Sequence, residues 1–447
     1  MNVNPESVPR FVLDVLEKLQ SAGHEGYLVG GCVRDLVMGK KPSDFDVATR
    51  ATPAEVERLF ERSVPVGERF GTVLVLGPPE SGTDVHVTTY RSEGAYKDGR
   101  RPSEVRFARS IHEDLSRRDF TMNAMAWNPL SGELVDPFEG RADIENRLIR
   151  AVGDPEERMR EDLLRTLRAV RFSAQFGFDI EEETWRAIER NAAGVRRLSA
   201  ERVRDELLKL LEAPHCERAL WTMAELGLLQ EILPELKGAA RLAQHKRGAP
   251  TLLDHLIQTA AACPADGELR LAGLVHDIGK LATRAIDPSG RVTFHGHTAS
   301  GAETARAIAR RLKLPKASAE RIASLVEMHM SLGPELTKKG LRRWVARRGA
   351  PWVRDLISLA RADALASGWE EPPPHLGEIE RSLEEIVRAK EAFTKQDLAV
   401  SGRDVMEVLG IGPGPKVGEV LDLLYEHVLE HPEQNTKDAL IAKMKSL

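Results

Sequence analysis

Residues 28–46, LVGGCVRDLVMGKKPSDFD, decide the fold of this 447-residue chain. They predict a short apolar strand that runs into Gly30 and Gly31, followed by a second strand that carries Asp44 and Asp46. Paired glycines after a strand let backbone N–H groups approach a phosphate closely. Carboxylates two apart on a strand point to one face, where Mg²⁺ can bind them together with phosphate oxygens. The stretch therefore favours a phosphoryl-transfer site over the alternatives, an ordinary turn and a solvated strand.

The composition limits the class of protein. Hydrophobic residues make up 42%, charged residues 30% and aromatic residues 5% of the chain, which is typical of a globular protein richer in helix than in strand. No run approaches the roughly 18 apolar residues of a membrane helix, and the first residues lack the pattern of a secretory signal. The cysteines, Cys32, Cys216 and Cys263, are far apart, which argues against disulfides and cysteine zinc sites. We therefore expect no membrane partner and a cytoplasmic location.

The order of the patterns predicts four parts. Strand and helix patterns alternate in the first part, and beyond Asp154 only helical patterns follow, the first of them one long helix over 155–176. A polar segment at 236–250 and three prolines at 372–374 mark further boundaries. The expected parts are an α+β head at 1–150, an all-α neck at 151–235, a histidine-rich helical domain at 251–370 and a helical tail at 375–447.

The first half of the chain resembles the class II tRNA nucleotidyltransferases and bacterial poly(A) polymerases. Residues 28–46 are similar to the nucleotidyltransferase motif of that family, and RRDFTMNAMA at 117–126 and EDLLR at 161–165 are similar to its next motifs. The resemblance implies a nucleotidyltransferase head, tRNA, CTP and ATP as partners, and Mg²⁺ held by Asp44 and Asp46 as catalytic residues. It implies that the nucleotide is bound by residues of these motifs: Gly30, Gly31, Arg34, Arg117, Arg118, Asp119, Asp162, Arg165 and Arg168.

Asp162 and Arg165 can be interpreted from their chemistry alone. They are three residues apart in a helical pattern, so we expect both on one helix face. A carboxylate accepts a hydrogen bond from the exocyclic amine that cytosine and adenine share, and a guanidinium donates to a ring nitrogen or a carbonyl. The pair could therefore act as a protein template for base choice. The alternative is an ordinary salt bridge on a helix surface.

One strand departs from the pattern of the family. Members often carry Glu where this chain has His86, and Asp84 lies two residues earlier, on the same expected face of the strand, where it could compensate. A polar loop at 91–102 stands where the family's loop supports the switch from C to A addition. Its presence argues against an enzyme that adds only CC, and the alternative is a generic surface loop.

A second group of histidine and aspartate residues, spaced as metal ligands could be, lies at 251–370. His276 and Asp277 follow an apolar run, with His255 upstream and Asp363 downstream. This arrangement resembles the HD phosphohydrolase domain. Imidazole and carboxylate donors together suit Mn²⁺, Ni²⁺ or Co²⁺ better than Ca²⁺.

Two more histidines resemble accessory positions of such a domain. His297 and His329 could complete a binuclear site, and Lys280 could neutralise a phosphate oxygen. The alternative for each histidine is a structural role.

The function that these patterns predict is template-independent addition of C, C and A to the 3′ end of tRNA, with a second phosphohydrolase activity. Three alternatives stay open: an enzyme that adds only the terminal A, a poly(A) polymerase, and an HD phosphohydrolase with an RNA-binding head. A basic cluster at 338–348 could follow the tRNA backbone, and its alternative is a solvated helix face. The sequence does not predict the oligomeric state.

Overall fold

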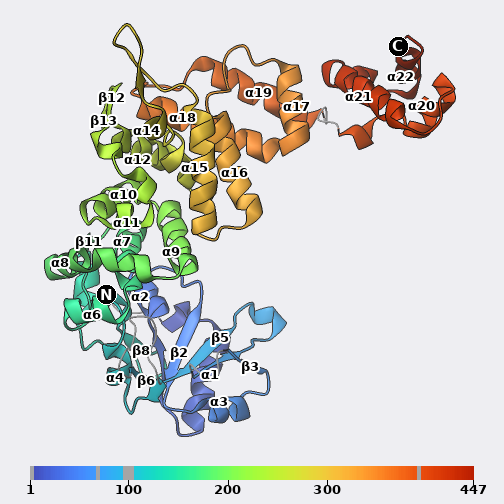
Figure 1. Ribbon diagram of the computed structural model, residues 1–447. Helices are drawn as coiled ribbons and strands as arrows, with labels where there is room; N and C mark the ends of the chain where they lie inside the picture. Colours follow the sequence, from blue (N-terminus) through green and yellow to red (C-terminus); the bar gives the residue numbers. More distant parts are fainter. Residues whose placement is uncertain (1–4, 67–70, 94–104, 390–393, 447) are drawn as a thin grey trace. The chain divides into compact units, whose positions relative to one another are not determined.

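The computed structural model describes residues 5–66, 71–93, 105–389 and 394–446 (Figure 1). The chain divides into two compact units, Met1–Pro234 and Glu235–Leu447. The division falls just before the polar segment at 236–250. Within the described residues, none of the helices has the length and apolar character needed to cross a bilayer.

The first unit is built on a seven-stranded sheet with the order β3-β4-β5-β2-β1-β8-β9. β2 and β5 at its centre are parallel, and the other neighbouring strands are antiparallel. The parallel register places Asp46 opposite His86 and Ala48 opposite Thr88. The strands of this sheet are β1 (Gly26–Val29), β2 (Phe45–Thr49), β3 (Ser63–Pro65), β4 (Thr72–Val75), β5 (Val85–Thr89), β8 (Ala126–Asn128) and β9 (Glu133–Val135).

The helices of the head begin and end where local chemistry requires. α3 begins with Pro53 as its first residue, and Glu55 accepts a hydrogen bond from the backbone N–H of Thr52 at 2.7 Å. The first α-helix begins at Arg10, directly after Pro9, which lacks the N–H that an internal helical position needs. These helices are α1 (Arg10–Ser21), α2 (Gly31–Val37), α3 (Pro53–Leu59), α4 (Ile111–Ser116) and α5 (Gly140–Glu145), and β6 (Arg91–Glu93) pairs with β7 (Val105–Phe107).

The expected single helix at 155–176 is wrong, because the structure contains two helices there. α6 (Pro155–Glu161) ends at Asp162, whose φ of −143° and ψ of 103° are extended, and α7 (Leu164–Phe176) follows. The Asp162 carboxylate accepts the backbone N–H of Leu164 at 3.1 Å, which satisfies a free donor in the first turn of α7. The remaining elements of this unit are β10 (Leu148–Ile149), β11 (Asp179–Ile180), α8 (Glu182–Asn191), α9 (Ala200–Glu212), α10 (Cys216–Glu225) and α11 (Leu228–Ile232).

The second unit is helical, as expected, apart from two short hairpins. The expectation that strands end with the head is therefore wrong at β12 (Ala243–Lys246) with β13 (Ala249–Thr251), and at β14 (Ala285–Ile286) with β15 (Val292–Thr293). The helices before residue 390 are α12 (Leu252–Ala262), α13 (Gly267–Val275), α14 (Lys280–Thr283), α15 (His297–Arg311), α16 (Lys316–Met328), α17 (Lys338–Arg348), α18 (Ala350–Ala366) and α19 (Pro374–Arg388).

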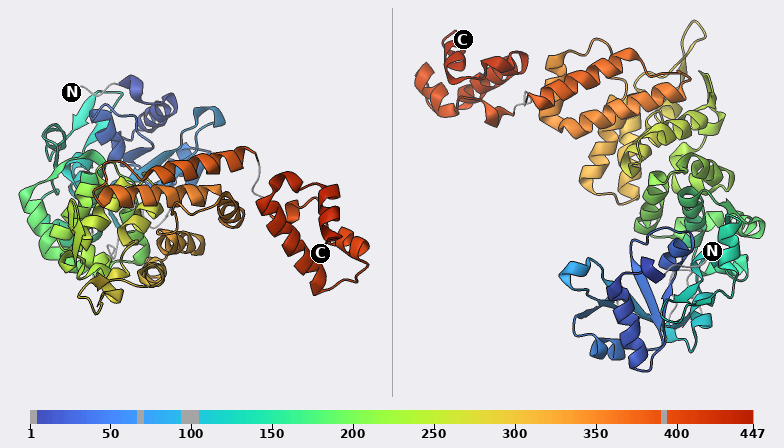
Figure 2. Two further views of the ribbon diagram at one scale, coloured as in Figure 1. Left: turned by 90° about the horizontal axis from the view of Figure 1, so that it is seen from above. Right: turned by 180° about the vertical axis from the view of Figure 1, so that it is seen from behind.

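The tail has a small hydrophobic core of its own. Figure 2 shows α20 (Gly402–Leu409), α21 (Pro415–Glu430) and α22 (Lys437–Met444) gathered around one another. Val405, Leu424, Val428 and Leu440 are fully buried between these helices. Burial of this kind contributes about 1.5–3 kcal/mol for each large aliphatic side chain.

Candidate functional site

A cavity of about 360 Å³ opens on the face of the head sheet over β1, β2 and β5. Asp44 and Asp46 both line it, as their two-residue spacing predicts, although Asp44 lies just before β2 rather than on it, and Ala48 lines it as well. The other residues that line the cavity come from neighbouring strands and from α4 with the turn after it: Val29, Thr72, His86, Thr88, Arg91, Asp114, Arg117 and Arg118.

The acidic side of this cavity suits a divalent ion. Asp44 accepts a hydrogen bond from the Ser43 hydroxyl at 2.8 Å, and Asp46 lies on the strand behind it with about half of its side chain exposed. Burial and the nearby Asp44 raise the pKa of Asp46, because two neighbouring carboxylates repel each other. A cation between them would relieve that repulsion. The donors therefore fit the divalent metal ions that nucleotidyltransferases use, commonly Mg²⁺.

His86 lies beside this pair, whereas Asp84 does not. The His86 Nδ1 atom is 3.7 Å from Oδ1 of Asp46. Asp84 precedes β5, and its carboxylate accepts the backbone N–H of Gly77 at 2.9 Å. The cavity lining does not include Asp84, so the expectation that it compensates for the missing Glu is not supported.

The basic side of the cavity is held in place by Asp114, which the sequence analysis missed. Arg117 donates to the Asp114 carboxylate at 2.7 Å and Arg118 donates to it at 3.2 Å. The Asp114 side chain is only 1% exposed. Burial by itself would raise its pKa, but Arg118 and Arg117 outweigh burial and lower the pKa of Asp114. Its position three and four residues before the arginines, on one helix face, is the signal that could have identified it.

Gly30 allows Arg118 to reach the cavity. Its φ of +75° is a backbone conformation that favours glycine, and a Cβ there would lie 2.6 Å from Nη1 of Arg118. Within the part of the chain that the structure describes, the Arg118 Nε atom is buried with no hydrogen-bond partner. A phosphate oxygen in the cavity would supply one. Gly30 therefore serves the site by making room for an arginine, and Gly31 follows it as the first residue of α2.

Arg34 is not among the described residues that line this cavity, and its role in nucleotide binding stays a prediction. Its guanidinium donates to Asp35 at 2.7 Å and to the Asn123 side chain at 2.8 Å. It also lies 5.5 Å from the ring centre of Phe172 and 4.7 Å from that of Phe176. Because these contacts bury the side chain, the charge of Arg34 stabilises the packing of α2 against α7.

Asp119 and Arg168 are likewise paired with each other rather than with the cavity. Arg168 donates two hydrogen bonds to Oδ2 of Asp119, at 2.8 and 2.6 Å, and lies 3.6 Å from Glu206. Burial would raise the pKa of Asp119, but Arg168 and the hydrogen bonds from Asn123 and the Phe120 N–H lower it to about 2. These contacts join the head to α7, and nucleotide binding by the two residues stays a prediction.

Asp162 and Arg165 do not share a helix face, since the break between α6 and α7 separates them. Arg202 of α9 donates to Asp162 at 2.6 Å. Arg165 is 8% exposed and donates to Glu161 at 2.6 Å and to the backbone carbonyl of Arg117 at 3.0 Å. The alternative, a salt bridge between Asp162 and Arg165, is not what the structure contains, since each residue has a separate partner. Arg165 contacts the segment that carries the cavity arginines.

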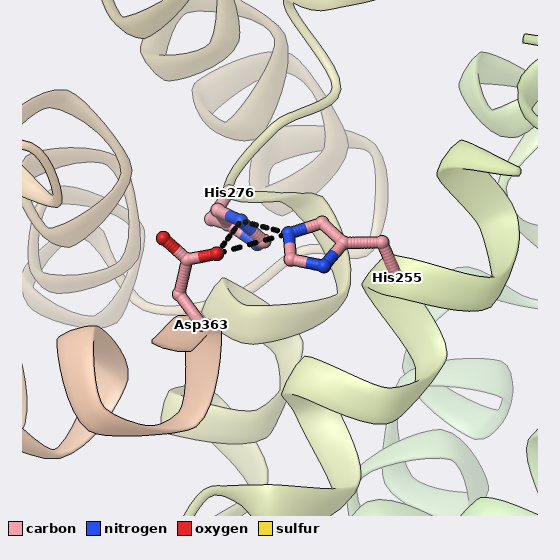
Figure 3. Close-up of side chains that lie close together, drawn as sticks. All are labelled: His255, His276 and Asp363. Carbon is pink, nitrogen blue, oxygen red and sulfur yellow. Dashed lines mark hydrogen bonds and ion pairs between the residues drawn. The ribbon is translucent and has the colours of Figure 1, made fainter. Parts of the chain in front are cut away.

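The second unit brings all six predicted residues of its histidine-rich segment together. We call this set the His–Asp cluster, and its members are His255, His276, Asp277, His297, His329 and Asp363. Figure 3 shows three of them, from α12, the end of α13 and α18, pointing toward one another. His255 Nε2 is 3.0 Å from Oδ1 of Asp363 and 3.2 Å from Nε2 of His276.

Asp277 stands at the centre of the His–Asp cluster and divides it in two. Its Oδ2 atom lies 3.5 Å from Nε2 of His255 and 3.4 Å from Nε2 of His276. Its Oδ1 atom lies 3.4 Å from Nε2 of His297 and 3.5 Å from Nε2 of His329. The carboxylate could therefore bridge two ions, each with imidazole donors.

The imidazole rings are oriented as metal ligands require. The Nδ1 atoms of His276, His297 and His329 each lie 2.7–2.9 Å from the backbone carbonyl three residues earlier. Such a contact places the ring proton on Nδ1 and leaves the Nε2 lone pair free for a metal ion. Among the described residues, Nε2 of His297 is buried without a hydrogen-bond partner. The donor set therefore fits Mn²⁺, Ni²⁺ or Co²⁺.

Two lysines accompany the cluster, and the sequence analysis missed one of them. Lys280 Nζ lies 2.5 Å from Asp277. Lys246, on β12, places its Nζ 2.8 Å from Nε2 of His255 and 3.5 Å from Oδ1 of Asp363. Both lysines line a pocket of about 900 Å³ that opens onto the cluster. No spacing signal marks Lys246, because only the β12–β13 hairpin brings it to α12.

The basic cluster at 338–348 is partly neutralised. It lies on α17, where Lys338 pairs with Glu385 at 2.7 Å and Lys339 pairs with Glu430 at 2.7 Å. Arg343 pairs with Glu426. The alternative of a charged helix face gains support from these pairs.

Comparisons with known proteins agree with the geometry of the head. The family model "Poly A polymerase head domain" matches residues 26–150, "Probable RNA and SrmB- binding site of polymerase A" matches 177–239, and the model of tRNA nucleotidyltransferase domain 2 matches 294–444. The chain is 36% identical over 430 residues to a CCA-adding enzyme of Levilactobacillus brevis. The alignment covers 96% of this chain and 95% of that enzyme. It is 37% identical over 435 residues to a CCA-adding enzyme of Geobacillus kaustophilus. That alignment covers 96% of this chain and 95% of the relative.

A solved structure has the same architecture. The CCA-adding enzyme of Bacillus stearothermophilus in complex with CTP matches with a TM-score of 0.73 and 31% identity, over 98% of this chain and 96% of that one. The sequence similarity and the structural similarity both extend over nearly the whole chain. The chain belongs to the CCA-adding enzyme family of tRNA nucleotidyltransferases.

Proposed function

We propose that the head adds C, C and A to the 3′ end of tRNA, using CTP and ATP. The observation that carries this proposal is the head cavity, in which Asp44 and Asp46 face Arg117 and Arg118. In-line nucleotidyl transfer needs carboxylates for a divalent ion next to cations for a triphosphate. Membership of the CCA-adding enzyme family supports the choice of tRNA and of both nucleotides.

Each side of the cavity has a distinct task in this reaction. Asp44 and Asp46 would hold the divalent ion, Mg²⁺ in our expectation, which would supply charge neutralisation at the α-phosphate and so favour attack by the 3′-oxygen of the tRNA. Arg117 and Arg118 bind the triphosphate and stabilise the charge on the departing pyrophosphate. Asp114 keeps the two guanidinium groups in place, so they need not be reordered when the nucleotide enters.

Base choice is assigned to the break between α6 and α7. Asp162 accepts from the exocyclic amine of cytosine or adenine, and Arg202 fixes the carboxylate that does so. Arg165 contacts the backbone of Arg117, so it couples this position to the triphosphate side of the cavity. An A-adding enzyme or a poly(A) polymerase would use the same groups. The full-length similarity to CCA-adding enzymes favours CCA addition over both.

The proposal that the cavity is the nucleotidyl-transfer site is tested by replacing one of its carboxylates with an amide of the same shape. Asp46→Asn should reduce incorporation of labelled CMP into tRNA by at least about 10³-fold, since it removes a charge that holds the metal ion. Asp14→Asn is the matched control, because Asp14 is exposed on α1, where it pairs with the exposed Arg10 outside the cavity lining. Circular dichroism and tRNA binding should stay as in the unmodified protein. Near-normal incorporation by Asp46→Asn would refute the assignment.

A second activity is supported by the His–Asp cluster. We propose that the cluster binds two transition-metal ions around Asp277 and hydrolyses phosphoesters, such as 2′,3′-cyclic phosphates at damaged RNA ends. Metal ions held there would activate a water molecule for attack on phosphorus. Lys280 and Lys246 would neutralise phosphate oxygens in the adjoining pocket.

The second activity can be separated from the first by one substitution. His276→Gln should abolish phosphoesterase activity and reduce the bound Ni²⁺, while CMP incorporation into tRNA stays within about twofold. Metal content by mass spectrometry and hydrolysis of a cyclic phosphate ester with added Mn²⁺, Ni²⁺ or Co²⁺ are the measurements. Unmodified protein that binds none of these ions and cleaves no ester would overturn this second proposal.

The cytoplasm is the proposed location. All three cysteines are buried and free, which suits a reducing compartment. The proposed partners, tRNA, CTP and ATP, are available there.

A further inference from the structure

His86 has no role in the reaction proposed for the head cavity. It lies on β5, in parallel register with Asp46 of β2, and both side chains line the head cavity. On the other side of β5 its register partner is Leu74 of β4. Because register partners lie on the same face of a sheet, the imidazole has a carboxylate on one flank and an apolar side chain on the other.

The distance between the two polar groups suits a shared ion. Nδ1 of His86 and Oδ1 of Asp46 are 3.7 Å apart, which is longer than a hydrogen bond. Two donors that each bind one ion at about 2.1 Å lie about 3.0 Å apart at a right angle and about 4.2 Å apart when opposite. The observed separation falls between these limits. An ion could therefore join the pair with little movement of either strand.

We propose that His86 is a third protein ligand of the divalent ion at Asp44 and Asp46, and that it shifts this site from Mg²⁺ toward Co²⁺ and Mn²⁺. Imidazole binds transition metals far better than it binds Mg²⁺, whereas carboxylate and water oxygens suit Mg²⁺. A site with two carboxylates and one imidazole thus accepts both kinds of ion but prefers the softer one. This inference rests on the proposed nucleotidyl transfer at the same cavity.

The charges around the cavity agree with a ligand role for His86. Arg117 and Arg118 already supply fixed positive charge for a triphosphate, so phosphate binding does not need an imidazole. His86 is about 41% exposed, which leaves its ring accessible to an incoming ion and makes the fold insensitive to its replacement.

The most direct test locates the ion in crystals of the full chain grown with Co²⁺ and CTP. Anomalous scattering at the cobalt edge should place an ion in contact with Asp46 and with the His86 imidazole. An ion at Asp44 and Asp46 with the His86 ring turned away would overturn the inference and leave the proposed function intact. No ion at either aspartate would count against both.

Binding measurements on variants give an independent readout. His86→Gln should weaken Co²⁺ binding at the head by at least about tenfold and change Mg²⁺ binding by less than about threefold. His86→Glu should tighten Mg²⁺ binding relative to the unmodified protein, because a third carboxylate suits Mg²⁺ better than an imidazole does, and it should lower the ratio of Co²⁺ to Mg²⁺ affinity. His112→Gln is the matched control, because His112 is exposed on α4 and outside the cavity lining.

The His–Asp cluster also binds Co²⁺ in this account, so the quantity to compare is the difference between variants. The Co²⁺ ions bound at the His–Asp cluster are the same in every variant. Only the Co²⁺ bound in the head cavity changes with the residue at position 86. Equal Co²⁺ and Mg²⁺ affinities in His86→Gln and in the unmodified protein would overturn the inference.

Discussion

Arg202 donates a hydrogen bond from Nη2 to Oδ2 of Asp162 across 2.6 Å. Asp162 lies at the break between α6 and α7, and Arg202 lies on α9, so the contact fixes a carboxylate that neither neighbouring helix could hold alone. The other oxygen of Asp162 accepts the N–H of Leu164. Base choice in this account depends on the direction in which that carboxylate points.

Asp162→Ala should relax discrimination against UTP and GTP by at least about tenfold, because the lost contact faces the edge of the base. Affinity for the triphosphate should fall much less, since Arg117 and Arg118 are unchanged. Misincorporation is measured with each single nucleoside triphosphate on tRNA that ends in the first C. If affinity collapses while misincorporation stays the same, Asp162 has only a structural role.

Arg202→Ala should relax base choice in the same direction but by less, since the carboxylate remains and only its orientation is lost. Arg202→Lys should recover part of the discrimination, because an ammonium can still donate to Asp162. Arg204→Ala on the same helix is the control, as Arg204 pairs with Asp205 beside it. Equal loss of stability in both alanine variants without a change in misincorporation would contradict a positioning role.

Asp114→Asn should raise KM for CTP and ATP by about tenfold with a smaller effect on kcat. The reason is that Arg117 and Arg118 would lose the buried charge that holds them and would repel each other. Steady-state kinetics over a range of nucleotide concentrations provides the measurement. Glu113→Gln, at the adjacent exposed position, should leave KM unchanged, and an equal rise in both variants would count against the prediction.

Much of this site could be predicted from the sequence, because its signals are local. The alternation of Asp44, Asp46 and Ala48 and the strand before Gly30 follow from residues a few positions apart. Arg34 could not be placed in the same way. Its direction depends on Asn123 and on Phe176, which are distant in the sequence and meet it only after α7 packs on the head.

The same reasoning explains the other differences between prediction and structure. The break at Asp162 is hidden by an unbroken helical pattern, and the carboxylate that caps α7 is visible only in three dimensions. Lys246 reaches the His–Asp cluster through a hairpin whose short strands have no apolar pattern. The six cluster residues do come together as expected, because helices and helix ends position them, and their role as metal ligands stays a prediction.

The ion pair between Asp119 and Arg168 gives the first unit a pH-dependent contribution to stability. The pKa of Asp119 is about 2 in the folded protein and about 3.9 in an unfolded chain, a difference that corresponds to roughly 2–3 kcal/mol. A lowered pKa stabilises the fold above the unfolded value, and this stabilisation disappears as the pH falls from about 4 to about 2. Urea unfolding should show Asp119→Asn less stable at pH 7, with the difference shrinking toward pH 2. A difference independent of pH would contradict the assignment.

Lys246→Ala should tighten binding of Ni²⁺ at the His–Asp cluster by about tenfold, because an ammonium group 2.8 Å from His255 and 3.5 Å from Asp363 competes with an ion for the same donors. Arg247→Ala is the control, since Arg247 is the exposed neighbour on the same hairpin. Calorimetric titration with Ni²⁺ compares the variants. Weaker binding in Lys246→Ala would show that the lysine supports the site rather than competing with the ion.

The central claim, that this head completes the 3′ end of tRNA, is tested most directly by supplying tRNA that ends at the discriminator base. With CTP alone, the account predicts extension by two nucleotides, and with CTP and ATP together, extension by three that ends in A. With ATP alone, tRNA that already ends in CC should gain one nucleotide and then stop. No extension with CTP, or a long tail of A on any of these substrates, would contradict the account.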